Sequence, residues 1–303
     1  MNTLIIKNLS KTYANGVMAL DTINLHINNG MFGLLGANGA GKSSLMRTIA
    51  TLQEPSTGSI SFNSADILKE PQEIRKQLGY LPQEFGVYPK ISAEKLLDHL
   101  AVLKGIINSK ERKNQVTSLL QQVNLYEHRK KEVHTFSGGM RQRFGIAQAL
   151  LANPQIIIVD EPTAGLDPEE RNRFLNLLGE IGENVIVILS THIVEDIRDL
   201  CKNMAILDKG QIVLTGKPSH LITAIENKIW SKRIEKSTLS NYKEKHLVIS
   251  NKLIEGETQI RVFADTQPDA SFNKEVANLE DLYFSTLKQL DSSKNNAKTE
   301  SYV

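Results

Sequence analysis

A glycine-rich segment carries the strongest chemical signal in the chain. In order, its residues are Gly36, Ala37, Asn38, Gly39, Ala40, Gly41, Lys42, Ser43 and Ser44. This spacing matches a phosphate-binding loop, in which four residues separate a glycine from Gly-Lys-Ser/Thr. Glycines let successive backbone N–H groups surround a polyphosphate, and the dipole of the following helix adds to the attraction. We predict that Lys42 reaches the β- and γ-phosphates of a nucleotide and that the Ser43 hydroxyl binds Mg²⁺.

Two adjacent carboxylates form a second chemical signal. Asp160 and Glu161 directly follow the β-branched run 156–159, which is typical of a strand buried on both faces of a parallel sheet. Buried carboxylates are costly unless a cation or a reaction uses them, and ligands of α/β sheets bind at the carboxyl ends of strands. We therefore predict that Asp160 is a Mg²⁺ partner, through water, and that Glu161 is the general base for an attacking water.

The elements that must position these residues alternate along the chain. An apolar run at 31–35 predicts a buried strand before the loop, and a helical pattern follows it with Leu45, Met46, Ile49 and Leu52 on one face. Further strands are expected at 78–81, 156–159, 185–189, 204–207 and 212–214, with helices after Pro168 and from Ile193. This alternation predicts a parallel α/β core, whereas segments 4–6, 23–27 and 58–62 predict an antiparallel β portion.

The pattern of predicted helices and strands changes after Pro218. One helix over 219–225 is followed by candidate strands at 229–234, 246–249 and 259–263, and then by a helical pattern at 279–290. We expect the polar tail 291–303 to be frayed. The sequence thus predicts a domain at 1–218 that holds every chemical motif and a small α+β domain at 219–303.

Composition limits the class of protein. The 303 residues are 40% hydrophobic, which suits one sizeable domain and a smaller one, and the net charge of +2 gives no sign of nucleic-acid binding. The single cysteine, Cys201, excludes an intramolecular disulfide, indicates a reducing compartment and is expected to be buried. Because the chain shows no secretory signal pattern and no apolar run near ~20 residues, we expect it to be soluble.

Further motifs occur in a fixed order around the carboxylates. Ser137, Gly138 and Gly139, between Phe136 and Met140, offer a hydroxyl and backbone N–H groups at a helix start. Such a start is typical of an anion site, and equally of an ordinary helix cap when taken alone. Asp167 follows the carboxylate strand, and Gln83 and His192 each follow another predicted strand.

Together these motifs resemble the nucleotide-binding subunit of an ATP-binding cassette (ABC) transporter, over residues 2–218. The resemblance implies an α/β P-loop NTPase fold of the ABC type, with a parallel α/β core, an antiparallel β subdomain and a helical subdomain at about 84–152. It also implies a sandwich dimer with a second copy or a homologous ATPase subunit. Each ATP would lie between the Gly36 loop of one chain and Ser137, Gly138 and Gly139 of the other.

The resemblance also implies roles for single residues. Tyr13 would stack on adenine, and Asp167 would act across the dimer. Gln83 would contact Mg²⁺ or the attacking water and report to the membrane subunit, and His192 would contact the γ-phosphate and orient the water. Ala37 and Ser44 differ from the proline and threonine usual in the family, but neither position supplies a required group.

Residues 136–140, here called the signature segment, indicate a subclass of the family. With Phe136 and Met140 it resembles exporter subunits of the ABC-2 type, including antibiotic and multidrug exporters, and the segment 279–283 resembles one near their ends. We therefore expect an ATP-hydrolysing subunit that works on the cytoplasmic face of the cell membrane and powers export through a separate permease.

Other interpretations stay open at this point. An importer ATPase of the same family shares all of these motifs. A cassette ATPase acting on ribosomes or DNA is disfavoured by the single cassette and the balanced charge, and a regulator without turnover by the presence of Glu161 and His192. Residues 129–131 are expected to be a solvated surface. Phe85, Val87 and Tyr88 would either pack locally or line a groove for a permease helix.

Overall fold

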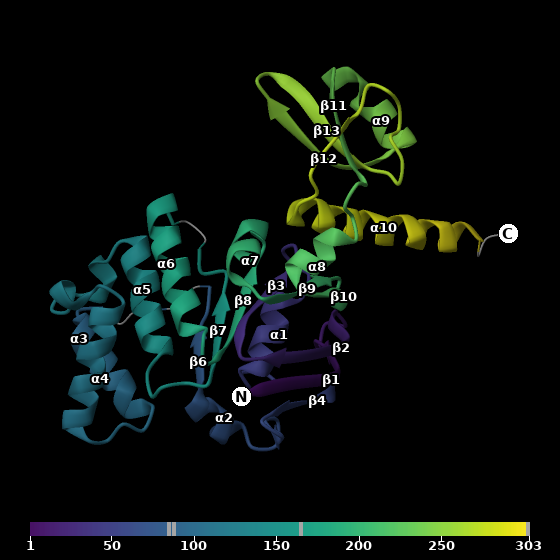
Figure 1. The fold of residues 1–303 in the computed structure, drawn as a ribbon. Helices are drawn as coiled ribbons and strands as arrows, with labels where there is room; N and C mark the ends of the chain where they lie inside the picture. Colours follow the sequence, from purple (N-terminus) through teal and green to yellow (C-terminus); the bar gives the residue numbers. More distant parts are fainter. Residues whose placement is uncertain (84–85, 87–88, 164–165, 301–303) are drawn as a thin grey trace. The chain divides into compact units, whose positions relative to one another are not determined.

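The computed structural model describes residues 1–83, 86, 89–163 and 166–300. Its chain divides into two compact units, Met1–Ile212 and Val213–Val303 (Figure 1). Every predicted site residue belongs to the first unit. The apolar residues expected to pack or to line a groove after Gln83, namely Phe85, Val87 and Tyr88, lie outside the described residues.

A six-stranded sheet forms the centre of the first unit, in the order β10-β9-β3-β8-β7-β6. Its strands are β3 (Gly30–Leu35), β6 (Leu78–Leu81), β7 (Ile156–Asp160), β8 (Ile186–Thr191), β9 (Asn203–Asp208) and β10 (Gln211–Gly216). β3 pairs in parallel with β8 and β9, and β7 pairs in parallel with β6 and β8. The predicted parallel core is confirmed. All residues of β3, β7 and β8 are buried, which explains their continuous apolar sequences.

A second, antiparallel sheet in this unit has the order β2-β1-β4-β5. Its strands are β1 (Thr3–Thr12), β2 (Met18–Asn28), β4 (Thr57–Phe62) and β5 (Ala65–Asp66). Buried and exposed residues alternate along β2 between Thr22 and Asn28, as expected for a sheet with one covered face. The predicted antiparallel β portion is therefore confirmed.

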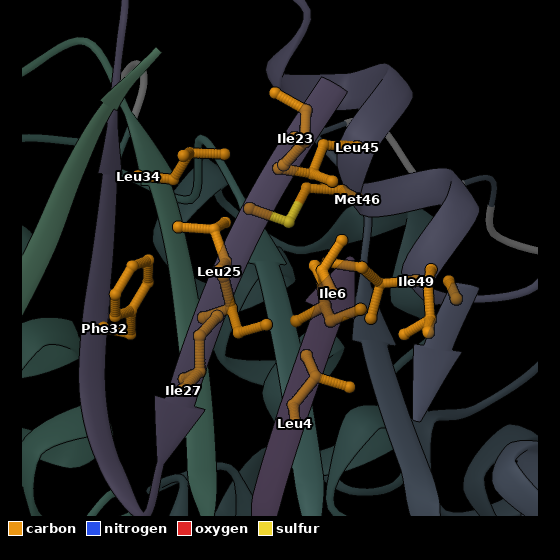
Figure 2. Close-up of a cluster of buried hydrophobic side chains, with 14 of the residues drawn as sticks. Leu4, Ile6, Ile23, Leu25, Ile27, Phe32, Leu34, Leu45, Met46 and Ile49 are labelled. Atoms are coloured by element: carbon orange, nitrogen blue, oxygen red, sulfur yellow. The ribbon is translucent and has the colours of Figure 1, made fainter. Parts of the chain in front are cut away.

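The helix α1 (Lys42–Ile49) contributes to one apolar core with both sheets. Figure 2 shows Leu45, Met46 and Ile49 of this helix among side chains from β1, β2 and β3. The prediction that Leu52 shares this face was wrong, because the helix ends at Ile49 and the Leu52 side chain is 61% exposed. Thr51, with φ of 57°, turns the chain out of the helical path.

The remaining helices of the first unit are α2 (Pro71–Gln77), α3 (Ala93–Leu103), α4 (Ser109–Gln122), α5 (Gly138–Ala149), α6 (Pro168–Ile181) and α7 (Val194–Leu200). Two short 3₁₀ turns, Tyr126–His128 and Val133–Thr135, lie between α4 and α5. Helices α3, α4 and α5 lie together beyond the β6 edge of the central sheet (Figure 1). α4 begins where the Asn108 side chain accepts hydrogen bonds from the N–H groups of Lys110 and Glu111.

The second unit is an α+β unit with a four-stranded sheet, in the order β12-β13-β11-β14. Its elements are α8 (Pro218–Thr223), β11 (Ile229–Ile234), a 3₁₀ turn at Lys236–Thr238, α9 (Leu239–Lys245), β12 (Leu247–Ile254), β13 (Glu257–Phe263), β14 (Asn273–Lys274) and α10 (Leu279–Glu300). Its own core contains Val248, Ile260, Val262 and Phe272. α10 continues to Glu300, past residue 291, where the sequence predicts the start of a frayed tail.

Cys201 is a free, buried cysteine, and burial raises the pKa of its thiol to about 12, with a further contribution from the charge of Asp196. Among the described residues, no helix combines the length and the apolar character needed to cross a bilayer.

We expect a chain shortened to residues 1–218 to fold by itself. The large core cluster lies wholly within residues 4–212, and the second unit has a separate core. Pro218 is chosen because it keeps β10 whole. Thermal unfolding followed by circular dichroism should give one cooperative transition. A chain of 1–218 that aggregates or unfolds without cooperativity would show that the boundary is misplaced.

Candidate functional site

The glycine-rich loop connects β3 to α1 in a conformation that depends on two glycines. Gly39 has φ of 81° and Gly41 φ of 110°, a region that favours glycine. A Cβ atom at Gly41 would lie 2.4 Å from the Ala19 carbonyl oxygen, and one at Gly36 would lie 2.5 Å from the Leu207 carbonyl oxygen. The loop is thus held against the backbone of β2 and β9, so its path is determined by the two strands.

A hairpin turn between β9 and β10 supports the loop. Lys209 and Gly210 both have positive φ, 46° and 81°, as the tight turns of two-residue hairpins require. The Gly210 N–H donates to the Ala40 carbonyl oxygen at 2.9 Å, and its carbonyl oxygen accepts from the Asp21 N–H at 2.8 Å. Sequence reasoning missed this contribution. The signal available was Lys-Gly between two short apolar strands.

The loop borders a cavity of about 560 Å³. The predicted residues in its lining are Tyr13, Ala37, Asn38, Gly39, Gly41, Lys42, Ser43, Ser44, Gln83 and Glu161. Its other lining residues, absent from the sequence-based prediction, are Val17, Met18, Ala19, Lys209 and Gly210. The wall therefore joins an apolar side near β2 to a polar side at the loop, which suits a ligand with a flat ring and a charged tail.

The Tyr13 side chain is fixed in the cavity wall by its hydroxyl group. This hydroxyl lies 3.0 Å from the Ser44 Oγ and donates to Gln53 Oε1 at 3.1 Å. Gln53 in turn donates to the Ser44 carbonyl oxygen and to Thr48 Oγ1, both at 2.9 Å. These bonds tie the ring to α1, and no sequence pattern had identified Gln53.

Three side chains predicted separately converge on Glu161. Lys42 is 5% exposed, and its Nζ lies 3.2 Å from Glu161 Oε1 while donating to the Gly36 carbonyl oxygen at 2.7 Å. Glu161 Oε2 lies 3.3 Å from both Gln83 Nε2 and His192 Nδ1. A carboxylate surrounded by a cation, an amide and an imidazole can accept a proton while its neighbours hold a water.

Asp160 lies directly before this carboxylate, at the end of β7. It is 3% exposed, and among the described residues its Oδ1 has no hydrogen-bond partner. Burial, followed by the charge of Asp160, raises the pKa of the nearby Tyr80. In the part of the chain that the structure describes, no group of three or more His, Cys, Asp and Glu could hold a metal ion. One carboxylate and the Ser43 hydroxyl fit Mg²⁺, which usually keeps waters and substrate oxygens as its other ligands.

The signature residues are not brought to this cavity within one chain. Ser137 is the N-cap of α5, and its Oγ accepts from the Met140 N–H at 3.2 Å. Asp167 is the N-cap of α6, and its Oδ1 accepts from the Glu170 N–H at 2.8 Å. Of the residues that the structure describes, neither these two nor Gly138 and Gly139 line the cavity. The helix-cap interpretation of Ser137 therefore holds within one chain.

Comparisons with known proteins agree with this geometry. A protein-family model described as "ABC transporter" matches residues 20–164. The linearmycin resistance ATP-binding protein LnrL of Bacillus subtilis is 33% identical over 221 residues, which cover 72% of this chain and 70% of LnrL. The ABC transporter ATP-binding protein NatA of the same species is 35% identical over 66% of this chain and 82% of NatA. This chain belongs to the ABC transporter ATP-binding family.

Solved structures support the same assignment for the ABC ATPase. The post-hydrolysis dimer of the ATP-binding cassette MJ0796 with ADP and Pi matches with a TM-score of 0.65 and 27% identity, over 71% of this chain and 98% of that one. The predicted fold class and the predicted family are thus confirmed. The family binds ATP, and the chain is an ATP hydrolase and the ATPase subunit of a transporter.

We expect Gly41→Ala to damage the loop far more than Gly39→Ala does. Both positions have positive φ, but a Cβ atom at Gly39 has no atom within 4 Å, whereas at Gly41 it meets Ala19. Gly39→Ala should lower the free energy of unfolding by about 1–2 kcal/mol and Gly41→Ala by about 3 kcal/mol or more. Denaturant unfolding measures both. Equal losses would mean that the contact with Ala19 is unimportant.

Proposed function

We propose that the residues around the cavity bind and hydrolyse Mg-ATP, and that the ABC ATPase thereby powers export through a separate permease. The observation that supports this best is the convergence of Lys42, Gln83 and His192 on Glu161, within 3.3 Å, beside a loop shaped for phosphate. Phosphoryl transfer to water needs positioning and neutralisation of charge more than covalent chemistry, and this arrangement supplies both.

Each group around the cavity has a distinct task in this proposal. Backbone N–H groups of the 36–44 loop and Lys42 bind the phosphates, and Tyr13 stacks on the adenine, which contributes ~1–3 kcal/mol. Ser43 and Asp160 would hold Mg²⁺, which neutralises phosphate charge when it is bound. Gln83 stands beside Glu161 and can contact that ion or the attacking water.

The ion pair between Lys42 and Glu161 links ATP binding to the hydrolysis step in this proposal. Phosphates bound at the loop would compete with Glu161 for the Lys42 ammonium, which lies 3.2 Å from Glu161 Oε1, and would leave the carboxylate free to accept a proton. Glu161 then takes the proton of the water, and His192, 3.3 Å from the same carboxylate oxygen, orients the water and contacts the γ-phosphate.

We expect Glu161→Gln to keep ATP binding and to lower turnover. The substitution removes the base, which should cost ~10²–10⁴ in rate. It also removes the negative charge that competes for Lys42, so ATP affinity should rise or stay unchanged. Phosphate release and calorimetry measure the two effects. Glu169→Gln is the matched control, because Glu169 is a 75% exposed surface residue paired with Arg173. Unchanged turnover in Glu161→Gln would exclude its role as the base.

Ser137, Gly138 and Gly139 of the signature segment can contribute to an ATP site if two chains form a dimer. Ser137 and Gly138 are exposed at the start of α5, and Asp167 is exposed at the start of α6, so a second chain can reach them. We propose that Ser137, Gly138 and Gly139 of a second copy, or of a homologous ATPase subunit, complete the ATP site across a two-fold axis. The dimeric assembly of the MJ0796 cassette supports this proposal.

Mixing two inactive variants tests the shared site. Lys42→Ala removes the phosphate cation, and Ser137→Arg blocks the signature, so each homodimer has two damaged sites. In the mixed dimer both changes can fall on one site, which leaves the other intact. ATP turnover of the mixture should therefore exceed that of either variant while staying below that of the unmodified chain. A covalently linked pair with no recovered activity would contradict the sandwich.

Export is the direction that we propose. The signature with Phe136 and Met140 and the similarity to a resistance protein both favour it. An importer stays the alternative, because the methionine import ATP-binding protein MetN 1 of Oenococcus oeni is 33% identical over 78% of this chain and 70% of MetN 1. Whether the transporter exports or imports, we propose that this subunit works at the cytoplasmic face of the cell membrane. Identifying the permease that co-purifies from membranes decides between the two directions.

A cavity beside α3 is the surface on which we propose that the permease docks. It measures about 290 Å³ and is lined by the exposed side chains of Leu52 and Leu103, which are 61% and 71% exposed, and by Lys104 and Tyr80. Burial lowers the pKa of Lys104, whose Nζ donates to the carbonyl oxygens of Arg75 and Leu78. Exposed apolar side chains around a hollow are typical of a surface that binds a partner, here an apolar helix of a transporter subunit.

We expect Leu103→Glu to reduce co-purification of the permease at least about tenfold, because a charge would be buried in the contact. ATP binding should not change, because Leu103 does not line the ATP cavity. Ile107→Glu is the control, since Ile107 is 84% exposed but does not line the hollow. Equal losses in both variants, or none in Leu103→Glu, would place the permease elsewhere.

A further inference from the structure

A buried carboxylate outside the cavity is bound to three different segments. Asp196, on α7, is 0% exposed and takes no part in the chemistry described above. Its Oδ2 accepts from Thr163 Oγ1 at 2.8 Å and from Thr191 Oγ1 at 3.4 Å. Its Oδ1 accepts from Arg171 Nε at 2.9 Å and forms an ion pair with Arg171 Nη2 at 2.7 Å.

Two of the three partners of Asp196 lie within two positions in the sequence of Glu161 or His192. Thr163 is two positions after Glu161, and Thr191 directly precedes His192. The Thr191 hydroxyl also accepts from the Ile193 N–H at 2.9 Å, so its hydrogen bonds span the His192 backbone. One carboxylate therefore restrains the chain after Glu161 and the chain around His192.

Arg171 adds a third segment. It lies in the first turn of α6, and its N–H donates to the Asp167 carbonyl oxygen at 2.9 Å. A fully buried carboxylate needs a charged partner and a full set of hydrogen bonds, and here it has both. Moving any one of the three segments would leave a buried polar group without its partner. The arrangement therefore favours a single relative position of the three segments.

The backbone of Glu161 needs such support. Glu161 has φ of 47°, in the left-handed region, which a residue other than glycine keeps only where its surroundings hold it. On its N-terminal side the Glu161 N–H donates to the Ser190 carbonyl oxygen at 2.9 Å. On its C-terminal side the first described side-chain anchor is the bond from Thr163 to Asp196.

We propose that Asp196 is a positioning residue for ATP hydrolysis, which holds Glu161 and His192 in the relative position that the reaction needs. The proposal rests on the proposed function of these two residues. Asp196 does not line the ATP cavity, so it should affect the rate of the chemical step and leave nucleotide affinity unchanged. Small displacements of reacting groups cost much of the rate, since catalysis here depends on geometry.

The first test is Asp196→Asn in the full-length chain. The amide keeps the size of the side chain but removes the charge that pairs with Arg171. We expect kcat to fall roughly tenfold to a hundredfold, with unchanged ATP affinity by calorimetry. The control is Asp199→Asn on the same helix, because Asp199 is 54% exposed and pairs with Arg198 at the surface. Its kcat should equal that of the unmodified chain. An unchanged kcat in Asp196→Asn, or an equal loss of ATP affinity, would overturn the proposal.

A double-mutant cycle tests whether Asp196 acts through its neighbours. His192→Ala and Asp196→Asn are measured singly and together. If Asp196 works by placing His192 and Glu161, the kcat loss of the double variant is smaller than the product of the two single losses, because one of the two groups to be placed is already missing. Losses that multiply would show independent effects and would overturn the proposal.

Two further variants keep the test decisive. If circular dichroism shows that Asp196→Asn does not fold, Thr191→Val replaces it, because valine has nearly the same shape and lacks only the hydroxyl. A lower kcat with unchanged ATP affinity supports the proposal, and an unchanged kcat overturns it. The proposed function and the positioning role fail in different ways. If Glu161→Gln hydrolyses ATP at the normal rate, Glu161 is not the general base. If Glu161→Gln is inactive but Asp196→Asn has a normal kcat, only the positioning role of Asp196 is refuted.

Discussion

The parallel register of β3, β7 and β8 is the constraint on which the site depends. Leu35 at the end of β3 pairs with Thr191 at the end of β8, and Asp160 at the end of β7 pairs with Ser190. These hydrogen bonds bring the starts of three connecting segments to one edge of the sheet. The glycine-rich loop, the carboxylate pair and His192 begin at this edge, so a shift of one residue in either pairing would move them apart.

Electrostatics then determines what these neighbouring groups do. Glu161 is 11% exposed and lies between the Lys42 ammonium and the polar side chains of Gln83 and His192. Charges act more strongly in such a poorly hydrated place than at the surface. Glu161 is thus sensitive to whatever else binds Lys42, and a polyphosphate is the natural competitor. The same reasoning applies to Asp196, whose pairing with Arg171 inside the protein restrains the segments around it.

Much of the fold was predictable because its signals are local. Continuous β-branched runs predicted β7 and β8, apolar residues at helical spacing predicted α1, and the glycine spacing predicted the loop between β3 and α1. Errors occurred at the ends of elements. Leu52 fits the periodicity of α1 but follows the turn at Thr51, and α10 continues past the last apolar residue of its pattern. Periodicity shows which face is apolar and says little about where a helix ends.

The sequence by itself determined the chemistry that this ABC ATPase can carry, because residue type and short spacing specify a phosphate loop and a carboxylate pair. Only the tertiary structure decided that Gln83 and His192 meet the same oxygen of Glu161, since 78 and 31 residues of chain separate them from it. It also decided that the cavity excludes Ser137 of the same chain. Such contacts follow from strand order and register, which arise from hydrogen bonds between distant segments and leave no mark in a local pattern.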